Sequence, residues 1–190
     1  MRPTITRADP SDAHWAADLT ARAFEGLAPM VWLVPPRHRR RAILTDLVRF
    51  YVDAALEIGE VFRSESRDAV AVWLPGDGDH IDVTLGIEFA DRFRHVGELL
   101  AAHRPAAPHH YLAFMAVERN RRGEGLGGAL LRAGHARLDA EGLPAYLVSG
   151  NPAARDLYAR HGYVADRPIL LPDGAPFWPM WRPAEAKDPA

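Results

Sequence analysis

Apolar residues recur every three or four positions in several long stretches of the chain, which is the spacing of one face of an α-helix. One such stretch is preceded by prolines and followed by a glycine, and it contains Ile43, Leu47, Phe50 and Tyr51. Capping residues sharpen other boundaries: asparagine followed by proline suits a helix start, and glycine suits a helix end. We therefore expect helices at 11–24 (capped by Ser11 or Asp12), 37–56, 83–102, 125–140 (ended by Gly142) and from Asn151 to about His161, with 24–36 as an apolar loop.

Shorter apolar runs bounded by turn residues predict β-strands. The run 111–117 has no charged side chain, which favours a strand buried on both faces. The runs 60–64 and 69–74 are joined by a polar turn and predict a hairpin. With further strands at 4–7, 145–148, 163–165 and 178–181, the pattern predicts a mixed α/β sheet of about seven strands flanked by helices.

Composition narrows the class of protein. A chain of 190 residues suits a single domain, which we expect over 1–183, followed by a flexible polar tail at 184–190. The absence of cysteine excludes a disulfide framework and a thiol nucleophile. A net charge of −2 predicts no nucleic-acid partner, so we interpret the basic run at 37–41 as a solvated helix start.

No targeting or metal-binding pattern stands out. The first residues lack the apolar core of a signal peptide, and the longest apolar runs are too short for a membrane span, so we expect a cytoplasmic protein with no membrane partner. His109 and His110 are adjacent, so on a strand they would point to opposite faces, and we predict no metal site.

The junction after the strand 111–117 carries the clearest chemical signal. A polar turn leads into Gly123, Gly125, Gly127 and Gly128, among which the next helix begins. Glycine lets a ligand approach the main chain closely, and the first N–H groups of a helix have no partner within it. With the helix dipole and the charge of Arg122, this arrangement predicts an anion site, and a diphosphate fits several converging N–H groups better than a carboxylate does.

Two common phosphate motifs fit the glycine-rich turn poorly. A P-loop requires lysine followed by serine or threonine, and the turn has neither. Gly123-x-Gly125-x-x-Gly128 matches the dinucleotide fingerprint, but the next strand ends in Val148-Ser149-Gly150-Asn151, without the carboxylate that would bind a ribose. A dinucleotide-binding oxidoreductase is therefore a weaker alternative.

The second half of the chain, from Tyr111 to Arg182, resembles the GNAT superfamily of acetyl-CoA-dependent N-acetyltransferases. Arg122-Gly123-Glu124-Gly125-Leu126-Gly127 fits that family's Arg/Gln-x-x-Gly-x-Gly/Ala signature after a buried strand, and the segment 151–163 supplies the asparagine, the tyrosine-bearing helix and the following Gly-Tyr. Two motifs at the correct separation are more specific than either alone. Residues 1–110 resemble the family only in the order of their elements, as expected of an acceptor-side half, with 111–183 as the acyl-CoA-binding half.

The resemblance implies roles for particular residues, with acetyl-CoA as the co-substrate. Main-chain N–H groups of the four glycines, next to Arg122, would hold the pyrophosphate. The main chain from Met115 to Val117 would pair with the pantetheine arm, the N–H of Val117 would polarise the thioester carbonyl, and Asn151 would contact the same arm. Tyr158 would protonate the leaving thiolate. On their own, Asn151 is also explained as a helix cap and Tyr158 as a core aromatic residue.

The acceptor is less well defined. The resemblance implies a primary amine, for which we favour a small molecule, although amino acids and protein amines stay open. Phe24, Met30 and Trp32 are explained by default as core residues, although the resemblance implies that this segment often borders the acceptor pocket. The strand 111–117 lacks the acid that relatives often carry, so a base would come from elsewhere, and His110, Glu25 and Glu60 are weak candidates. A non-catalytic acyl-CoA sensor is an alternative function that these features also fit. They are compatible with either a monomer or a homodimer.

Overall fold

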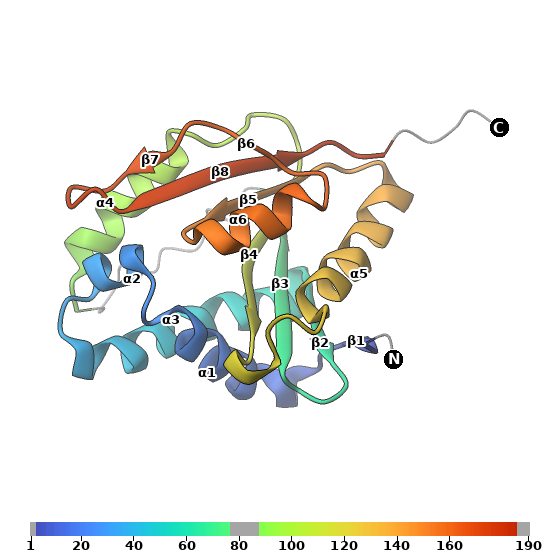
Figure 1. Ribbon diagram of the computed structural model, residues 1–190, viewed down its shortest axis with the longest axis horizontal. Helices are drawn as coiled ribbons and strands as arrows, with labels where there is room; N and C mark the ends of the chain where they lie inside the picture. Colours follow the sequence, from blue (N-terminus) through green and yellow to red (C-terminus); the bar gives the residue numbers. More distant parts are fainter. Residues whose placement is uncertain (1–2, 77–87, 186–190) are drawn as a thin grey trace.

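The computed structural model describes residues 3–76 and 88–185, which form one mixed sheet covered by helices on both faces (Figure 1). The eight-stranded sheet has the order β1-β2-β3-β4-β5-β8-β6, and β7 pairs with β8. The predicted fold class is confirmed. The strands are β1 (Ile5–Arg7), β2 (Glu60–Ser64), β3 (Ala69–Pro75), β4 (His110–Val117), β5 (Ala145–Ser149), β6 (Val164–Ala165), β7 (Ile169–Leu170) and β8 (Pro176–Arg182). The helices are α1 (Ala13–Phe24), α2 (Ala28–Leu33), α3 (Arg37–Ile58), α4 (Ala90–Ala101), α5 (Leu126–Glu141) and α6 (Pro152–Ala159), with 3₁₀ turns η1 (Pro10–Asp12) and η2 (Arg119–Arg121).

Strand β3 lies at the centre of the core and is buried on both faces. Ala69, Ala71 and Trp73 pack into the cluster formed with α5, whereas the alternate residues pack into the cluster formed with α1 and α3. This two-sided burial follows from the alternation of side chains along a strand. It explains why β3 reads as a continuous apolar run instead of an alternating one.

Two details of the N-terminal half differ from the sequence-based expectations. The segment 24–36 is not a loop, because α2 occupies its centre: Pro29 suits a first helical turn, and Leu33 is buried in the cluster between α2 and α3. Asp12 occupies the N-cap position of α1, as predicted, but its side chain makes no capping hydrogen bond and is buried beside Arg63. The side-chain cap lies one turn earlier, where Asp9 at the start of η1 accepts a hydrogen bond from the N–H of Ser11 at 2.8 Å.

The other predicted helices and strands begin and end close to the observed boundaries. Two of the predicted segments extend onto residues that the structure does not describe. Strand β7 was not predicted, since two residues carry no periodicity. The predicted helix 83–102 corresponds to α4, but its first residues lie outside the described part, as does 186–190 of the predicted tail. No helix in the described ranges is long and apolar enough to cross a membrane.

Strands β4 and β5 diverge, and this divergence creates the opening used by the candidate site. They pair in parallel only at His110↔Ala145 and Tyr111↔Tyr146, although β4 continues to Val117. In Figure 1, β4 runs nearly vertically whereas β5 and β8 run nearly horizontally. On its other edge β4 pairs with β3 along its length, and a register shift leaves Ala113 as an extra residue, a β-bulge that bends the strand. The second half of β4 therefore has an open main-chain edge.

An ion pair between Arg182 and Asp139 fastens β8 to α5, and it gives a prediction about acid stability. Its two N···O distances are 2.7 and 2.8 Å, and the Arg182 side chain is 7% exposed. The hydrogen bonds from Arg182 hold the pKa of Asp139 below its ordinary value. Because the folded-state pKa is lowered, the stabilisation is complete above the unfolded-state pKa and is lost as the pH falls through the folded-state pKa. We expect Asp139→Asn to lower the free energy of unfolding at pH 7 by about 2 kcal/mol and to flatten its decline in acid, measured by urea titration.

The control for this prediction is Asp53→Asn on α3. Asp53 also accepts two short contacts from an arginine, Arg49, but both side chains are about half exposed. Exposed pairs on one helix contribute only about 0.5 kcal/mol or less. Equal losses of unfolding free energy in the two variants would show that the Arg182–Asp139 pair stabilises the fold no more than an exposed ion pair does.

Candidate functional site

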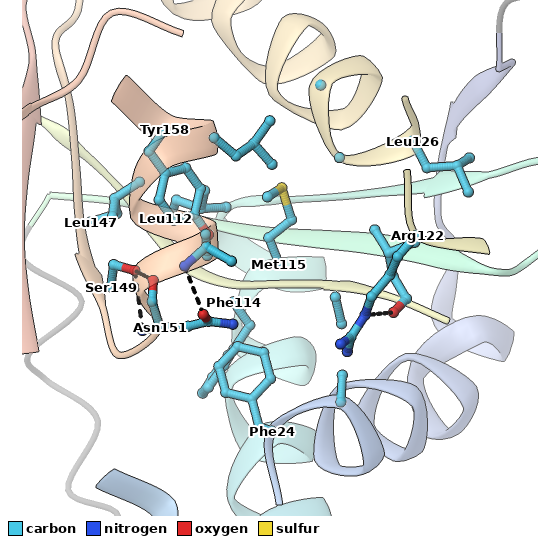
Figure 2. A pocket seen from close by; sticks show the side chains of 18 of the residues that line it. Phe24, Leu112, Phe114, Met115, Arg122, Leu126, Leu147, Ser149, Asn151 and Tyr158 are labelled. Carbon is cyan, nitrogen blue, oxygen red and sulfur yellow. Dashed lines mark hydrogen bonds between the residues drawn. The ribbon is translucent and has the colours of Figure 1, made fainter. Parts of the chain in front are cut away.

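A cavity of about 460 Å³ opens where β4 and β5 diverge. Figure 2 shows side chains from both strands, the glycine-rich turn, α6 and α1 around it. All nine residues predicted to bind acetyl-CoA or to act on its thioester line this cavity: Met115, Val117, Arg122, Gly123, Gly125, Gly127, Gly128, Asn151 and Tyr158. The fold thus brings together two motifs that lie about 30 residues apart in the chain.

The glycine-rich turn leaves a run of main-chain donors without acceptors. In the described part of the chain, no main-chain N–H group from Arg122 to Gly128 donates to a protein acceptor, and the first helical hydrogen bond runs from Ala129 N to Gly125 O at 3.0 Å. Gly123 and Gly125 have φ angles of +87° and +82°, which other residues adopt only at a cost. These donors lie at the N-terminus of α5, where the helix dipole also favours an anion.

The four glycines serve two different purposes. A Cβ on Gly123 or Gly125 would meet nothing within 4 Å, so at these positions glycine allows the backbone conformation and leaves space open. A Cβ on Gly127 would lie 3.0 Å from Leu157 Cδ2, and one on Gly128 would lie 2.9 Å from His161 Nε2. The second pair therefore lets α5 pack closely against α6 and the turn that follows it.

The open edge of β4 presents main-chain groups to the cavity. Glu118 N donates to Asp68 O at 2.8 Å, so this N–H points toward β3. Because successive N–H groups of a strand point to opposite edges, those of Val117 and Met115 point away from β3, into the opening. The carbonyl of Val117 agrees with this direction, since it accepts a hydrogen bond from Arg122 Nε at 3.4 Å.

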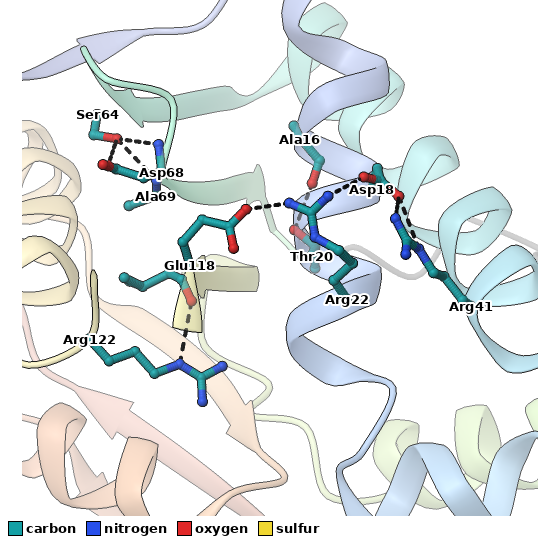
Figure 3. A network of polar contacts seen from close by, with 11 residues as sticks. Ala16, Asp18, Thr20, Arg22, Arg41, Ser64, Asp68, Ala69, Glu118 and Arg122 are labelled. Atoms are coloured by element: carbon teal, nitrogen blue, oxygen red, sulfur yellow. Dashed lines mark hydrogen bonds and ion pairs between the residues drawn. The ribbon is translucent and has the colours of Figure 1, made fainter. Parts of the chain in front are cut away.

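A network of ion pairs fixes the end of β4 and the turn after it (Figure 3). Glu118 pairs with Arg22 of α1, Arg22 pairs with Asp18 at 2.5 Å, and Asp18 pairs with Arg41 of α3 at 2.7 Å. Within the turn, Arg121 pairs with Asp68 at 2.6 Å and with Glu124 at 2.9 Å.

Arg122 differs from these arginines. It makes no ion pair with any described carboxylate, and its side chain lines the cavity at the end of β4, where Nε donates to the Val117 carbonyl (Figure 2). No described carboxylate therefore neutralises this positive charge at the cavity.

Helix α6 contributes Asn151 and Tyr158 from its two ends. Asn151 Oδ1 accepts a hydrogen bond from Ala153 N at 3.0 Å, which confirms the predicted cap and leaves the amide nitrogen free of hydrogen bonds to described residues. Tyr158 is 7% exposed and packs against the ring of Tyr163 at 5.8 Å. Burial raises the pKa of the Tyr158 hydroxyl above its ordinary value, so the group is a phenol and not a phenolate at neutral pH.

The three residues considered as bases on sequence grounds do not line the cavity. Glu60 is buried in ion pairs with Arg7 and Arg137, and burial lowers the pKa of His110. Glu25 is also absent from the lining. Trp32 lines neither this cavity nor the smaller apolar cavity that adjoins it on the side of α3 and α4. Its ring packs instead under Arg92, whose Cζ lies 4.9 Å from the ring centroid.

Sequence analysis missed Ser149 at the end of β5. Its hydroxyl donates to Asn151 O at 3.0 Å and so joins the strand end to the start of α6 inside the cavity lining. A serine followed by glycine and asparagine is common in turns, which is why its position carried no signal.

Comparisons with known proteins agree with this geometry. Residues 89–165 match the family model described as an acetyltransferase (GNAT) domain. The chain is similar to the solved structure of "histone acetyltransferase HPA2 and related acetyltransferase" from Corynebacterium glutamicum ATCC 13032, with a TM-score of 0.74, 26% identity and coverage of 98% of this chain and 99% of that one.

More distant structures share the fold. A mosquito arylalkylamine N-acetyltransferase like 5b gives a TM-score of 0.67 at 12% identity, covering 96% of this chain and 100% of that one. A chain of the NatC complex bound to Gag peptide and CoA gives 0.55 at 13% identity, covering 96% and 99%. The central part of this chain thus matches a GNAT acetyltransferase domain, and the whole described fold is similar to that of GNAT acetyltransferases.

Proposed function

We propose that this protein transfers an acetyl group from acetyl-CoA to a primary amine of a small molecule, by direct attack in a ternary complex. One observation carries the proposal: the unpaired N–H groups from Arg122 to Gly128, the open edge of β4 and the phenol of Tyr158 all border one cavity. The match to a GNAT acetyltransferase domain supports acetyl transfer in general, and the NatC neighbour was solved with CoA.

Acetyl-CoA would lie along the opening between β4 and β5. The N–H groups of Gly123, Gly125, Gly127 and Gly128 would bind the pyrophosphate, with Arg122 adding charge. The pantetheine arm would pair with the main chain of Met115 and Val117, as an additional strand pairs with an exposed sheet edge. The Asn151 amide nitrogen, which its cap leaves free, would donate to the same arm.

The chemistry then follows from these positions. The amine nitrogen attacks the thioester carbonyl, whose developing oxyanion accepts a hydrogen bond from Val117 N–H. As the C–N bond forms and the C–S bond breaks, the sulfur takes a proton from Tyr158, and the tyrosine regains one from the ammonium nitrogen directly or through water. Burial makes Tyr158 a weak acid, so its main contribution would be a strong hydrogen bond to the thiolate as charge develops.

Release of free thiol from acetyl-CoA in the presence of a panel of primary amines tests the proposal. We expect amine-dependent thiol release and, in a thermal-shift titration, stabilisation by CoA but not by nicotinamide dinucleotides, because a ligand of the folded state raises its stability. Stabilisation by a dinucleotide and not by CoA would support the oxidoreductase alternative and remove the proposal.

A second candidate function is a non-catalytic acyl-CoA sensor. The observation in its favour is that the described residues lining the cavity include no carboxylate and no histidine. Such a sensor would bind acetyl-CoA without releasing thiol with any amine, so the two readouts of the same experiment separate the candidates.

A further inference from the structure

A second cavity of about 160 Å³ adjoins the first one on the side of α3 and α4. The two cavities share wall residues, among them Phe24, Leu27, Ala113 and Phe114. Figure 2 shows Phe24 and Phe114 together at this boundary. A molecule in the second cavity would therefore extend toward the open edge of β4, where the thioester is proposed to lie.

The lining of the second cavity is almost wholly apolar. It carries no charged side chain among the described residues, and the only polar side chains in it are the hydroxyls of Tyr51 and Tyr111. Three of its aromatic rings form an edge-to-face cluster, with Phe114 centred 5.6 Å from Phe24 and 5.3 Å from Tyr51. Such a surface favours an apolar or aromatic guest and penalises a charged one.

The size of the cavity limits that guest. A cavity of about 150 Å³ lined by Leu, Ile and Phe stays dry and binds benzene. The second cavity has a similar volume and a similar lining, so it accommodates one six-membered ring or a branched chain of similar size.

Electrostatics argue against a polycationic acceptor. Burial keeps Tyr51 and Tyr111 in their neutral phenol form, because it raises the pKa of each hydroxyl. The charge that acts on Tyr51 is the positive one of Arg104. A second or third ammonium group on the acceptor would thus find no counter-charge among the described residues that line this cavity.

From the continuity, size and lining of the two cavities we infer that the acceptor is a primary amine carrying a single compact apolar group, such as a phenyl ring, which this second cavity binds. The inference rests on the proposed acetyl transfer and gives its substrate class. Leu47 of α3 forms part of the wall of the second cavity but not of the first, so it offers a way to alter the acceptor site alone.

The first measurement compares three acceptors with the wild-type protein. We expect kcat/KM for 2-phenylethylamine to exceed that for ethanolamine and for spermidine by about 10-fold or more, since burying a ring of this size is strongly favourable. The neutral analogue 2-phenylethanol should bind without turnover and compete with 2-phenylethylamine but not with acetyl-CoA. Equal or better use of spermidine or ethanolamine would overturn the inference.

The second measurement uses variants of the wall. Leu47→Ala should lower kcat/KM for 2-phenylethylamine by about 10-fold and leave acetyl-CoA affinity unchanged. Ile43→Ala is the matched control, because Ile43 lies on the same helix and is 9% exposed against 8% for Leu47, but does not line the cavity. Leu100→Phe, which reduces the space, should impair 2-phenylethylamine selectively and keeps the test valid if Leu47→Ala folds poorly. Equal effects of Leu47→Ala and Ile43→Ala, with Leu100→Phe unaffected, would overturn the inference.

The two proposals fail in distinguishable ways. If acetyl-CoA binds but no amine releases thiol, acetyl transfer is wrong and the acceptor assignment is wrong with it, whether or not 2-phenylethanol binds. If other amines are acetylated but 2-phenylethanol does not bind, only the apolar acceptor assignment is wrong.

Discussion

Replacing Gly125 by aspartate is expected to abolish measurable acetyl-CoA binding while leaving the fold intact. Gly125 is the residue before α5, and a side chain there would extend into open space beside the unpaired N–H groups. An aspartate carboxylate would satisfy some of these donors and repel a diphosphate, so we expect a loss of affinity of about 100-fold or more, measured by calorimetry. The same carboxylate stabilises the start of α5 as a cap would. We therefore expect the melting temperature to fall only by the amount that a non-glycine residue costs at this left-handed φ angle.

Gly125→Asn is the matched control for this variant. Asparagine has the same size as aspartate and also tolerates the left-handed region, so it carries the steric and conformational cost without the charge. We expect Gly125→Asn to bind acetyl-CoA at least about 10-fold more tightly than Gly125→Asp, with a difference that shrinks at high salt. Equal affinities would mean that the anion is bound elsewhere, and unchanged affinity in both would remove the pyrophosphate site.

The glycine-rich turn and the elements around it could be predicted from the sequence because their signals are local. The buried strand, the glycine-rich turn and the cap at Asn151 each depend on a few neighbouring residues, and the structure has β4, α5 and α6 at these positions. These local signals also predicted the residues of the two motifs that line the cavity. They did not give the reason for Gly127 and Gly128, because the contacts with Leu157 and His161 join segments about 30 residues apart.

The second cavity could not be predicted in the same way. Tyr51 and Phe114 follow the spacing of ordinary core residues, and only the folded chain shows that they border a cavity instead of filling one. The divergence of β4 from β5 is equally invisible in the sequence, since it depends on the bulge at Ala113 and on pairing with β8. Cavities arise from what side chains leave unfilled, and periodicity describes only which face they occupy.

The apolar acceptor cavity also bears on the missing base. An ammonium group moved into apolar surroundings has its pKa lowered, because burial disfavours the charged form. A monoamine held by its apolar group would therefore enter the site in its neutral, nucleophilic form at a smaller cost than in water. In the proposed reaction, this desolvation favours the deprotonated amine, which a carboxylate on β4 would otherwise produce by acting as a base.

Tyr158→Phe is expected to lower kcat by about 100-fold to 1,000-fold, the range for loss of a general acid, and to leave acetyl-CoA affinity within about twofold. The hydroxyl of Tyr158 makes no hydrogen bond to a described residue, so its removal should cost little stability. The control is Tyr163→Phe, which removes a buried hydroxyl from the neighbouring ring of the same pair. Tyr163 hydrogen-bonds to His135 Nε2 at 3.0 Å and does not line the cavity, so its loss should cost about 1 kcal/mol of stability but little turnover. A fall in kcat shared by both variants would make the effect one of packing, and a fall in affinity equal to the fall in kcat would place Tyr158 in binding instead of proton transfer.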